Sequence, residues 1–379
     1  MILQVLVVST QGWRVLSGIV ATCSGGSQSR ASRPEGLRRR RYASSVSRVV
    51  LLRSVELFDG SRLVPGRRDL LVRNGRIAAV EAAGSVEPPA GARVTEGGAV
   101  LPGLVDAHVH VSFSTAEAIV RGGVTGALDL GEPIEAAFAP HPPLRVRAAG
   151  PLLTAPGGYP TRTWGANGYG LEVAGEHEAR EAVAMLAGRG AAMIKVAITQ
   201  EPSLDAAAVA VIVEAAAARG LRVAAHALRQ ADARVALAGG VDVLAHTPVE
   251  PLGDDTIAAF ASRGTTVIST VLAFGGAEAT RVNLMALAAA GCTIAYGTDL
   301  GNDGIEPGAN AEELSIVAEA CGGAEAALRA ATAGAAALAG LAPARVRVGE
   351  PANIIVCDGL GFAHLNRPSM IWIDGEEIA

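Results

Sequence analysis

The stretch LVDAHVHVSF, residues 104–113, begins a series of short apolar segments that decides the fold. Alanine-rich stretches separate these segments, and Ser203 and Gly220 are the expected N-cap and C-terminal stop of one helix between them. Eight strand–helix units over about 240 residues predict an α/β fold, a (β/α)₈ TIM-like barrel, whose usual size is about 250 residues. The seven segments after the first are 123–131, 144–153, 191–199, 221–227, 241–248, 265–273 and 292–300.

Strand-rich segments flank this series at both ends of the chain. Before it lie short β-rich runs, and Asn74-Gly75 between two of them is a strong hairpin signal. After it, ANIIVCDG and SMIWIDGEEI have the same texture. We therefore predict a small β-sandwich domain built from both termini, residues 49–101 plus 341–379, and a barrel domain over residues 102–340.

Residues 1–48 differ from the rest of the chain, and we predict that they are a disordered leader. The apolar run Met1–Val8 is too short to span a bilayer. The four arginines Arg38–Arg41 follow this run, which reverses the order that a secretion signal needs. We expect a cytoplasmic protein, although the unusual leader leaves export open.

Composition narrows the range of partners. The net charge is −5, aromatic residues make up 3 %, and the arginines are scattered, which argues against a nucleic-acid partner. The four cysteines lie far apart without a CxxC pair, so we expect buried, reduced thiols and no disulfide framework or zinc knuckle. A small-molecule substrate is the expected partner, no membrane association is expected, and homo-oligomerisation is left open.

Six polar residues fall at the ends of the predicted strands. The gaps between them correspond to whole strand–helix units of roughly 30 residues, so all six are expected on the face where barrel enzymes carry out their chemistry. A lone histidine in an apolar strand is usually a satisfied core group, but four at matching strand ends favour metal binding. Asp299 could also be a turn residue before Gly301. The six are His108, His110, Lys195, His226, His246 and Asp299.

Lys195 is the only lysine among 32 basic residues. A lysine amine can lose its proton and react, whereas a guanidinium stays charged. An ammonium would be repelled by two divalent ions, so near a metal pair this lysine must be neutral or carbamylated. A carbamate formed with carbon dioxide is an anionic ligand that can bridge two ions, and with four histidines and one aspartate it completes a binuclear site. The alternative, a surface lysine with a buried stem, fits poorly with the apolar sequence MIKVAIT.

The motifs LPGLVDAHVH, MIKVAIT, VAAHA, VLAHT and YGTD resemble, in order and spacing, the metal-binding motifs of the amidohydrolase superfamily. Within it, the chain is most similar to the carboxylated-lysine subgroup related to imidazolonepropionases and metal-dependent carboxypeptidases or prolidases. This resemblance implies two divalent metal ions, with Zn²⁺ expected first and manganese, cobalt or iron as alternatives. One ion would be held by His108, His110 and Asp299, the other by His226 and His246, with carbamylated Lys195 and a hydroxide bridging them.

The same resemblance implies a hydrolase acting on carbon–nitrogen bonds. The hydroxide would attack the substrate carbonyl, and Asp299 would be catalytic, moving the proton to the leaving amine. The expected substrate is an N-acyl amino acid, a dipeptide or a cyclic amide. Arg229 stands where the deaminase branch typically has an acidic residue, which disfavours deamination. Alternatives are ester, lactone or phosphotriester hydrolysis at the same site, and a non-catalytic structural homologue.

The loop TAPGGYPTRTWGANGYG, which follows the third predicted strand, is the candidate substrate-binding segment. It carries Tyr159, Arg162 and Trp164 in a chain that has few aromatic residues. We expect a pocket wall here, with Arg162 binding a substrate carboxylate. An equally weighted alternative is a glycine-rich connector packed by its own side chains.

Overall fold

The computed structural model describes residues 4–7, 14–17, 49–199 and 202–379. By its internal contacts the chain divides into two compact units, residues 1–46 and 47–379. The first contains β1 (Gln4–Val7) and β2 (Arg14–Ser17), which pair antiparallel. The rest of the predicted leader, with Cys23, lies outside the described residues, and its disorder stays a prediction.

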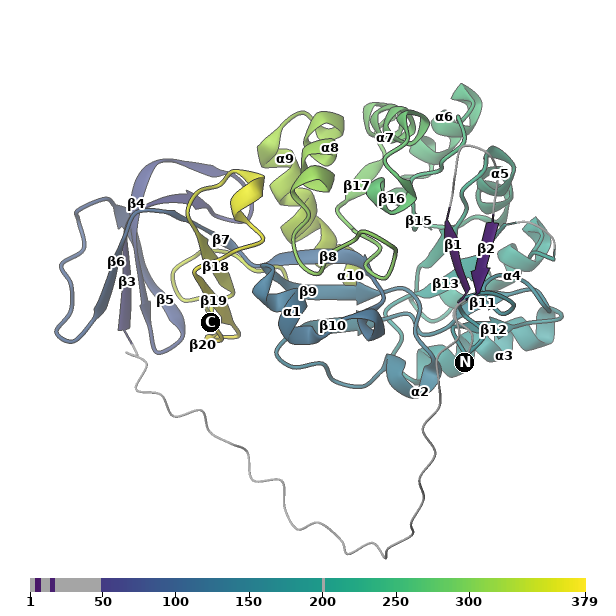
Figure 1. The fold of residues 1–379 in the computed structure, drawn as a ribbon, viewed down its shortest axis with the longest axis horizontal. Coiled ribbons are helices and arrows are strands. Elements are labelled where there is room, and N and C mark those ends of the chain that lie inside the picture. Colours follow the sequence, from purple (N-terminus) through teal and green to yellow (C-terminus); the bar gives the residue numbers. More distant parts are fainter. Residues whose placement is uncertain (1–3, 8–13, 18–48, 200–201) are drawn as a thin grey trace, which may run out of the picture. The chain divides into compact units, whose positions relative to one another are not determined.

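Parallel strands run through the larger unit in two sheets (Figure 1). A three-stranded sheet has the order β10-β9-β8, and a seven-stranded sheet has the order β12-β11-β13-β14-β15-β16-β17. Apart from β10 and β12, these strands are buried over most of their length, which explains why they read as continuous apolar runs rather than alternating ones. Their bounds are β8 (Leu104–Val109), β9 (Val124–Asp129), β10 (Arg145–Ala148), β11 (Leu152–Thr154), β12 (Gly170–Glu172), β13 (Ile194–Ala197), β14 (Val223–His226), β15 (Val243–Leu244), β16 (Thr266–Ile268) and β17 (Thr293–Ala295).

Backbone hydrogen bonds connect the two parallel sheets at both sides. Next to β10 and β13, the amide of Ala192 donates to the carbonyl of Ala148 at 2.8 Å. Next to β8 and β17, the amide of Ala107 donates to the carbonyl of Tyr296 at 3.0 Å. The predicted α/β class with parallel strands is confirmed, and each of the eight predicted segments contains a strand. The third segment is divided between β10 and β11.

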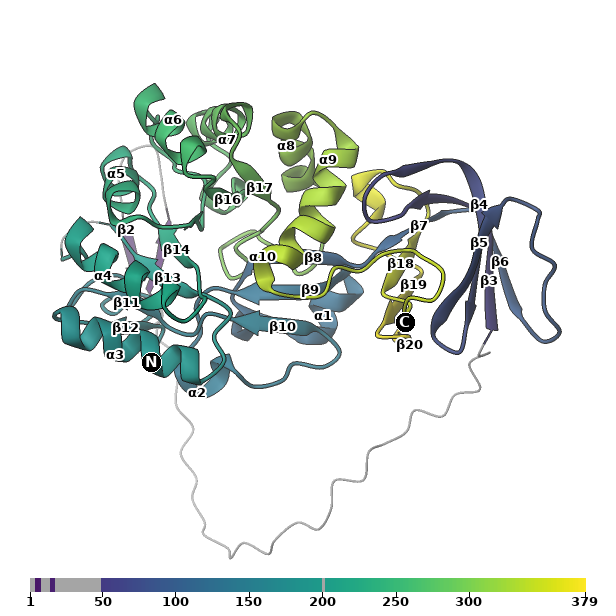
Figure 2. The ribbon, with the colours of Figure 1, turned by 180° about the vertical axis from the view of Figure 1, so that it is seen from behind.

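Helices alternate with these strands, and successive helices from α3 to α9 pack side by side (Figure 2). In α4 the buried residues Val209, Ile212 and Ala216 form one apolar stripe. The prediction that Ser203 caps this helix is wrong, because Asp205 is the N-cap and its side chain accepts the amide of Ala208 at 2.8 Å. The helices are α1 (Ala116–Arg121), α2 (Ile134–Ala137), α3 (Glu176–Gly188), α4 (Ala206–Ala217), α5 (Gln230–Gly239), α6 (Asp254–Ser262), α7 (Glu278–Ala290), α8 (Ala311–Cys321), α9 (Ala324–Arg329) and α10 (Ala335–Ala339).

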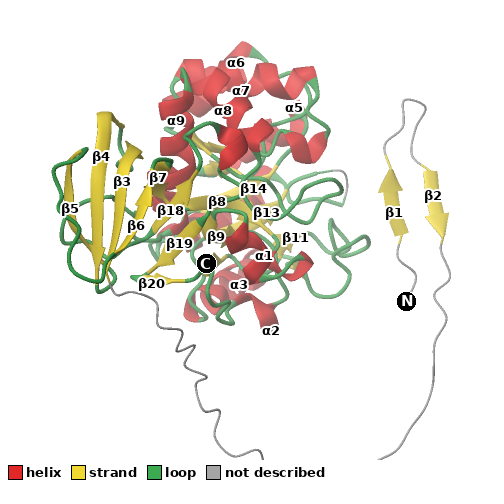
Figure 3. Cartoon of the chain, turned by 60° about the vertical axis from the view of Figure 1, so that its left-hand side comes forward, coloured by secondary structure: helices red, strands yellow, loops and turns green. Residues whose placement is uncertain are grey.

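A third, mixed sheet joins segments from both ends of the described 49–379 range (Figure 3). Its order is β20-β19-β18-β7-β3-β4-β5, with β6 paired to β3, and β7 pairs antiparallel with β18. The predicted hairpin is confirmed, because Asn74 (φ 51°) and Gly75 (φ 74°) form the turn between β4 and β5. The domain boundaries stay a prediction. The strands are β3 (Val49–Phe58), β4 (Leu63–Arg73), β5 (Arg76–Ala82), β6 (Arg93–Glu96), β7 (Ala99–Pro102), β18 (Ile354–Cys357), β19 (Met370–Ile373) and β20 (Glu376–Glu377).

Two sequence-based expectations concern thiols and membranes. Within the described residues Cys292 and Cys357 are free and buried, as expected, whereas Cys321 is free but only partly buried because it ends α8. No helix in the described ranges combines the length and the apolar character that crossing a bilayer requires.

Candidate metal centre

Parallel strands bring the predicted polar residues to one end of the sheets. His108 lies in β8 and Lys195 in β13, and His226 is the last residue of β14. The remaining three follow the ends of β8, β15 and β17 within four residues. All six side chains are buried, with at most 7 % of any residue exposed, so they form an internal cluster and not a polar surface: His108, His110, Lys195, His226, His246 and Asp299.

The Asp299 carboxylate lies at the centre of this cluster. His108 Nε2 and His110 Nε2 each lie 3.3 Å from its Oδ1, and His246 Nδ1 lies 3.5 Å from its Oδ2. His108, His246 and Asp299 offer three ligand atoms within 4.8 Å of one another. This nitrogen and oxygen donor set is the type that binds divalent transition ions.

Backbone carbonyls fix the orientation of two of the rings. His108 Nδ1 lies 2.8 Å from the carbonyl of Ala245, and His110 Nδ1 lies 2.8 Å from that of Gly131. A carbonyl only accepts, so Nδ1 carries the hydrogen in both rings, and in a neutral ring Nε2 is a bare acceptor. Burial lowers the pKa of His108 well below 6.5, which keeps this ring neutral.

A positive charge is therefore needed between the rings and Asp299. Asp299 Oδ1 is buried and has no hydrogen-bond partner among the described residues, although it faces the Nε2 atoms of His108 and His110. Acceptors that face one another across 3.3 Å repel unless a cation or a proton lies between them. Burial lowers the pKa of His110, but Asp299 outweighs this effect and raises it, so a proton on His110 is the alternative to a metal ion. The residues present fit a metal ion.

A second part of the cluster joins His226, His246 and Lys195 to the first. His226 Nδ1 lies 3.0 Å from His246 Nε2, and burial lowers the pKa of His226 to about 3. Lys195 Nζ lies 3.5 Å from His108 Nε2, and no carboxylate within the described ranges forms an ion pair with it. Burial lowers the pKa of Lys195 to about 7, so a large fraction of the amine is neutral near neutral pH. A neutral amine is the form that adds carbon dioxide.

Aromatic side chains from the predicted substrate loop cover the histidines. Tyr159 stacks on His226 with ring centroids 4.8 Å apart, and Trp164 meets His110 edge-on at 5.3 Å. Trp164 Nε1 donates to the Tyr159 hydroxyl at 2.7 Å, which fixes the two rings relative to each other. The loop therefore lies against two histidines of the cluster, and its part in substrate binding stays a prediction.

Arg162 lies in the same loop and lines a cavity of about 340 Å³. Its side chain is exposed and forms no ion pair with any described residue. Gly157 has a φ of 69°, and a Cβ there would lie 2.1 Å from the Arg162 guanidinium, so the glycine lets the cation pack against the backbone. The cavity is lined by Gly157, Gly158, Tyr159, Arg162, Thr163, Thr199 and Pro202.

Several neighbours of the site were not predicted from the sequence. Phe274 meets the His246 ring edge-on at 5.0 Å, and Thr270 Oγ1 lies 3.2 Å from His246 Nδ1. Phe113, also not predicted, packs at 5.8 Å against Tyr169 of the predicted substrate loop, and both rings pack against Trp164. The sequence signal for Phe274 was its position just after a predicted strand, in a chain with only six phenylalanines.

Buried carboxylates support the loops around the histidines. Asp129 accepts the amides of Val111 and Gly131 at 2.8 and 2.9 Å, which braces the loop after His110 and the carbonyl that holds this ring. Burial, and then the neighbouring Asp129, raises the pKa of Glu132 to about 7. The sequence left Asp129 without a role, and the structure gives it one in orienting these loops.

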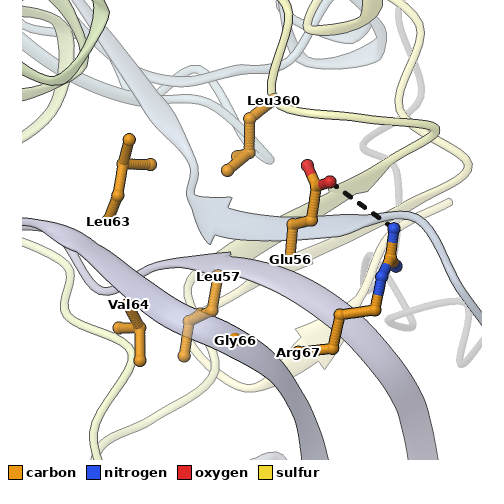
Figure 4. A pocket seen from close by; sticks show the side chains of 7 residues that line it. All are labelled: Glu56, Leu57, Leu63, Val64, Gly66, Arg67 and Leu360. Carbon is orange, nitrogen blue, oxygen red and sulfur yellow. Dashed lines mark hydrogen bonds and ion pairs between the residues drawn. The ribbon is translucent and has the colours of Figure 1, made fainter.

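A second cavity of about 340 Å³ lies on the mixed sheet (Figure 4). An ion pair between Glu56 and Arg67, 3.5 Å apart, crosses one end of it. It contains none of the six clustered residues, so it is not the candidate site. Its lining residues are Glu56, Leu57, Leu63, Val64, Gly66, Arg67 and Leu360.

Comparisons with known proteins agree with this geometry. The amidohydrolase family profile matches residues 99–378. An uncharacterised protein of Mycobacterium tuberculosis (strain ATCC 25618 / H37Rv) is 32% identical over 216 residues, which cover 50% of this chain and 55% of that protein. A dihydroorotase of Syntrophus aciditrophicus is 41% identical over 83 residues, 21% of this chain and 20% of that protein. The chain thus spans about half the length, or less, of the curated relatives it matches.

Solved structures share the fold over most of the chain. A prolidase complexed with N-methylphosphonate-L-proline has a TM-score of 0.71 and 22% identity, covering 87% of this chain and 99% of the other. An ochratoxinase from A. niger has a TM-score of 0.68 and 20% identity, covering 87% of this chain and 95% of the other. At these identities the likeness concerns the fold alone.

Proposed function

Because the chain belongs to the amidohydrolase family, we propose that it is a metal-dependent hydrolase that cleaves a carbon–nitrogen bond of an amide-type substrate. The observation that carries this proposal is the convergence of His108, His110 and His246 on the Asp299 carboxylate. This cluster is buried, and its nitrogen and oxygen lone pairs repel one another unless a cation or a proton lies between them.

We further infer that the two parallel sheets close into one (β/α)₈ barrel, with the mixed sheet forming a β-sandwich domain beside it. The bonds from Ala192 to Ala148 and from Ala107 to Tyr296 support closure at both sides. In such a barrel the carboxyl ends of the strands surround one active-site face. The six clustered residues all lie at or near these ends.

Two divalent ions, with Zn²⁺ the first choice, would be held by two groups of residues. His108, His110 and Asp299 are assigned to one ion, and His226 and His246 to the other, with Lys195 joining them as a carbamate. The ions would supply Lewis acidity and a water molecule of lowered pKa. The neutral fraction of Lys195 and its 3.5 Å contact with His108 support its assignment.

The protein's own groups would orient the substrate and move its proton. Asp299 is assigned as the base that accepts a proton from the attacking water and returns it to the leaving nitrogen. Tyr159 and Trp164, which cover His226 and His110, would exclude bulk water from the reacting carbonyl. The carbonyls of Ala245 and Gly131 hold the His108 and His110 rings in the required tautomer.

The proposed substrates are N-acyl amino acids, dipeptides or cyclic amides. Arg162, which has no acidic partner in the described part of the chain, would bind a substrate carboxylate at the cavity beside Tyr159. Structural neighbours named as a prolidase and an Xaa-Pro dipeptidase are consistent with a substrate of this kind.

Elemental analysis tests the proposal directly, on protein purified with bicarbonate and without chelator. We expect two equivalents of metal per chain and hydrolysis within a panel of N-acyl amino acids and dipeptides. Removal of the metal should abolish turnover, and its return should restore it. Metal-free protein that still hydrolyses these amides, or metal-loaded protein that hydrolyses none of them, would contradict the proposal.

A further inference from the structure

One buried carboxylate connects β8, which carries His108, to the segment after β17 that carries Asp299. Asp106 Oδ1 accepts the amide of His108 at 3.0 Å and the amide of Thr298 at 3.0 Å. Asp106 Oδ2 accepts the Thr298 hydroxyl at 2.6 Å. Asp106 is only 2 % exposed and forms no ion pair with any described residue. Its three hydrogen bonds therefore all go to His108, a member of the metal cluster, and to Thr298, the neighbour of Asp299.

Asp299 adopts a backbone conformation that needs such support. Its φ of 57° lies in the left-handed region, which is unfavourable for a residue with a side chain. Its own amide donates to the carbonyl of His108 at 2.8 Å. This backbone bond and the two bonds from Thr298 to Asp106 together hold the turn at Thr298 and Asp299 against β8. The carboxylate of Asp299 then faces His108 and His110.

We propose that Asp106 and Thr298 are positioning residues that hold Asp299 in the conformation in which it binds the metal ion with His108 and His110. This inference rests on the metal-dependent function proposed above. Neither side chain contacts a metal-ligand atom. Asp106 acts through the backbone amides of His108 and Thr298, and the Thr298 hydroxyl acts through Asp106. Asp106 Oδ1 accepts the amides of both His108 and Thr298, which lie 190 residues apart in the chain. This shared acceptor fixes the position of the Thr298 segment along β8 more closely than strand pairing alone would.

A structural role alone would predict lower stability without a specific effect on metal binding. Thr298→Val removes only the hydroxyl and keeps the shape and the amide. Thr298→Ser keeps the hydroxyl and is the conservative variant that should restore binding. Thr332→Val is the matched control, because Thr332 is also 2 % exposed and donates its hydroxyl to a carbonyl, that of Leu328 at 2.6 Å, but has no bond to the cluster.

The test is a titration of metal-free protein with Co²⁺, followed by visible absorption against a competing chelator, together with urea unfolding of the same metal-free samples. We expect Thr298→Val and Asp106→Asn to weaken Co²⁺ binding about 10- to 100-fold, the range seen when groups that orient metal ligands are removed. Thr298→Ser and Thr332→Val should bind as the wild type does. If Asp106→Asn does not fold, Thr298→Val carries the test alone.

Three outcomes would overturn the inference, and the third also rejects the function on which it rests. Wild-type protein that binds Co²⁺ and a folded Thr298→Val variant that binds it equally well would reject the positioning role alone. Equal weakening in Thr298→Val and Thr332→Val, in step with their unfolding midpoints, would do the same. Wild-type protein that binds no Co²⁺ would instead reject the proposed metal-dependent function, and the inference with it.

Discussion

His226 Nδ1 lies 3.0 Å from His246 Nε2, at the ends of two neighbouring parallel strands. Both rings are buried, and burial lowers the pKa of each, so that at neutral pH both are uncharged. Two neutral rings can share only one hydrogen across this contact. These two rings would hold the second divalent ion, which would take the place of that hydrogen.

The first prediction concerns this pair. His226→Asn should lower the metal content from two equivalents to about one per chain, because it removes a nitrogen ligand of the ion assigned to His226 and His246. Turnover should fall by at least about 100-fold, since metal-assisted attack on the carbonyl is worth several kcal/mol. Elemental analysis with kinetics on the same preparation measures both. His364→Asn, at an exposed histidine outside the cluster, should change neither, and two retained equivalents in His226→Asn would reject the assignment.

The second prediction concerns pH and Lys195. Burial lowers the pKa of this amine to about 7, whereas it is 10.5 in the unfolded chain. Between these values the unfolded state binds one proton more than the native state, so the free energy of unfolding should rise with pH, by about 1.4 kcal/mol for each pH unit from this group. Below pH 7 both states are protonated and the contribution is constant.

Urea unfolding of metal-free protein between pH 7 and 10, without bicarbonate, measures this slope. Lys195→Met keeps the apolar stem and removes the amine. Subtracting the free energy of unfolding of the variant from that of the wild type at each pH cancels the contributions of tyrosines and cysteines. The remaining pH dependence is that of Lys195. A difference that does not change with pH would show that the amine is not held neutral, and would remove the basis for a carbamate. Lys195→Met should also lose metal when bicarbonate is present.

The strand positions could be predicted because buried parallel strands are continuous apolar runs, and chain order alone then determines which residues end each strand. No further information was needed to place His108, Lys195 and His226 at the same end of the sheet. Their positions follow from the stretches LVDAHVH, AAMIKVA and LRVAAH. The strand β12, Gly170–Glu172, was not predicted: it pairs with β11 as the substrate loop returns to the sheet edge. Its sequence, GLE, has neither the length nor the pattern of the other strands.

Contacts that depend on strand register were beyond the sequence. Asp106 and Thr298 are 192 residues apart, and their bond exists only because β8 lies beside the segment after β17 in one particular register. No role was predicted for Asp106 from the sequence. The position of Phe274 over His246 likewise depends on how the loop after β16 turns. Such pairs follow from three-dimensional packing and not from local periodicity.

The third prediction concerns the Asp299 side chain. Asp299→Asn has the same shape but cannot accept a proton at neutral pH, so turnover should fall by about 10²- to 10⁴-fold, the usual contribution of a positioned acid or base. The protein should remain folded, because the backbone bond from the amide of residue 299 to the carbonyl of His108 does not involve the carboxylate. Kinetic constants should be given per bound metal, so that weaker binding is separated from lost proton transfer. A fully active variant would remove the assigned role.

The fourth prediction concerns Arg162 and the substrate carboxylate. The guanidinium lines the cavity beside Tyr159 and pairs with no carboxylate in the described residues, so a substrate anion would be its partner. Arg162→Gln should lower kcat/KM for a dipeptide or N-acyl amino acid by about 10- to 100-fold, since a hydrogen bond to a charged group contributes about 1.5–3 kcal/mol. The same substrate with its carboxylate converted to a carboxamide should be hydrolysed equally by both proteins. Arg189→Gln, at the exposed end of α3, is the matched control and should leave both substrates unaffected. Equal losses for the acid and the amide would mean that Arg162 supports the loop through Gly157 and does not recognise the carboxylate.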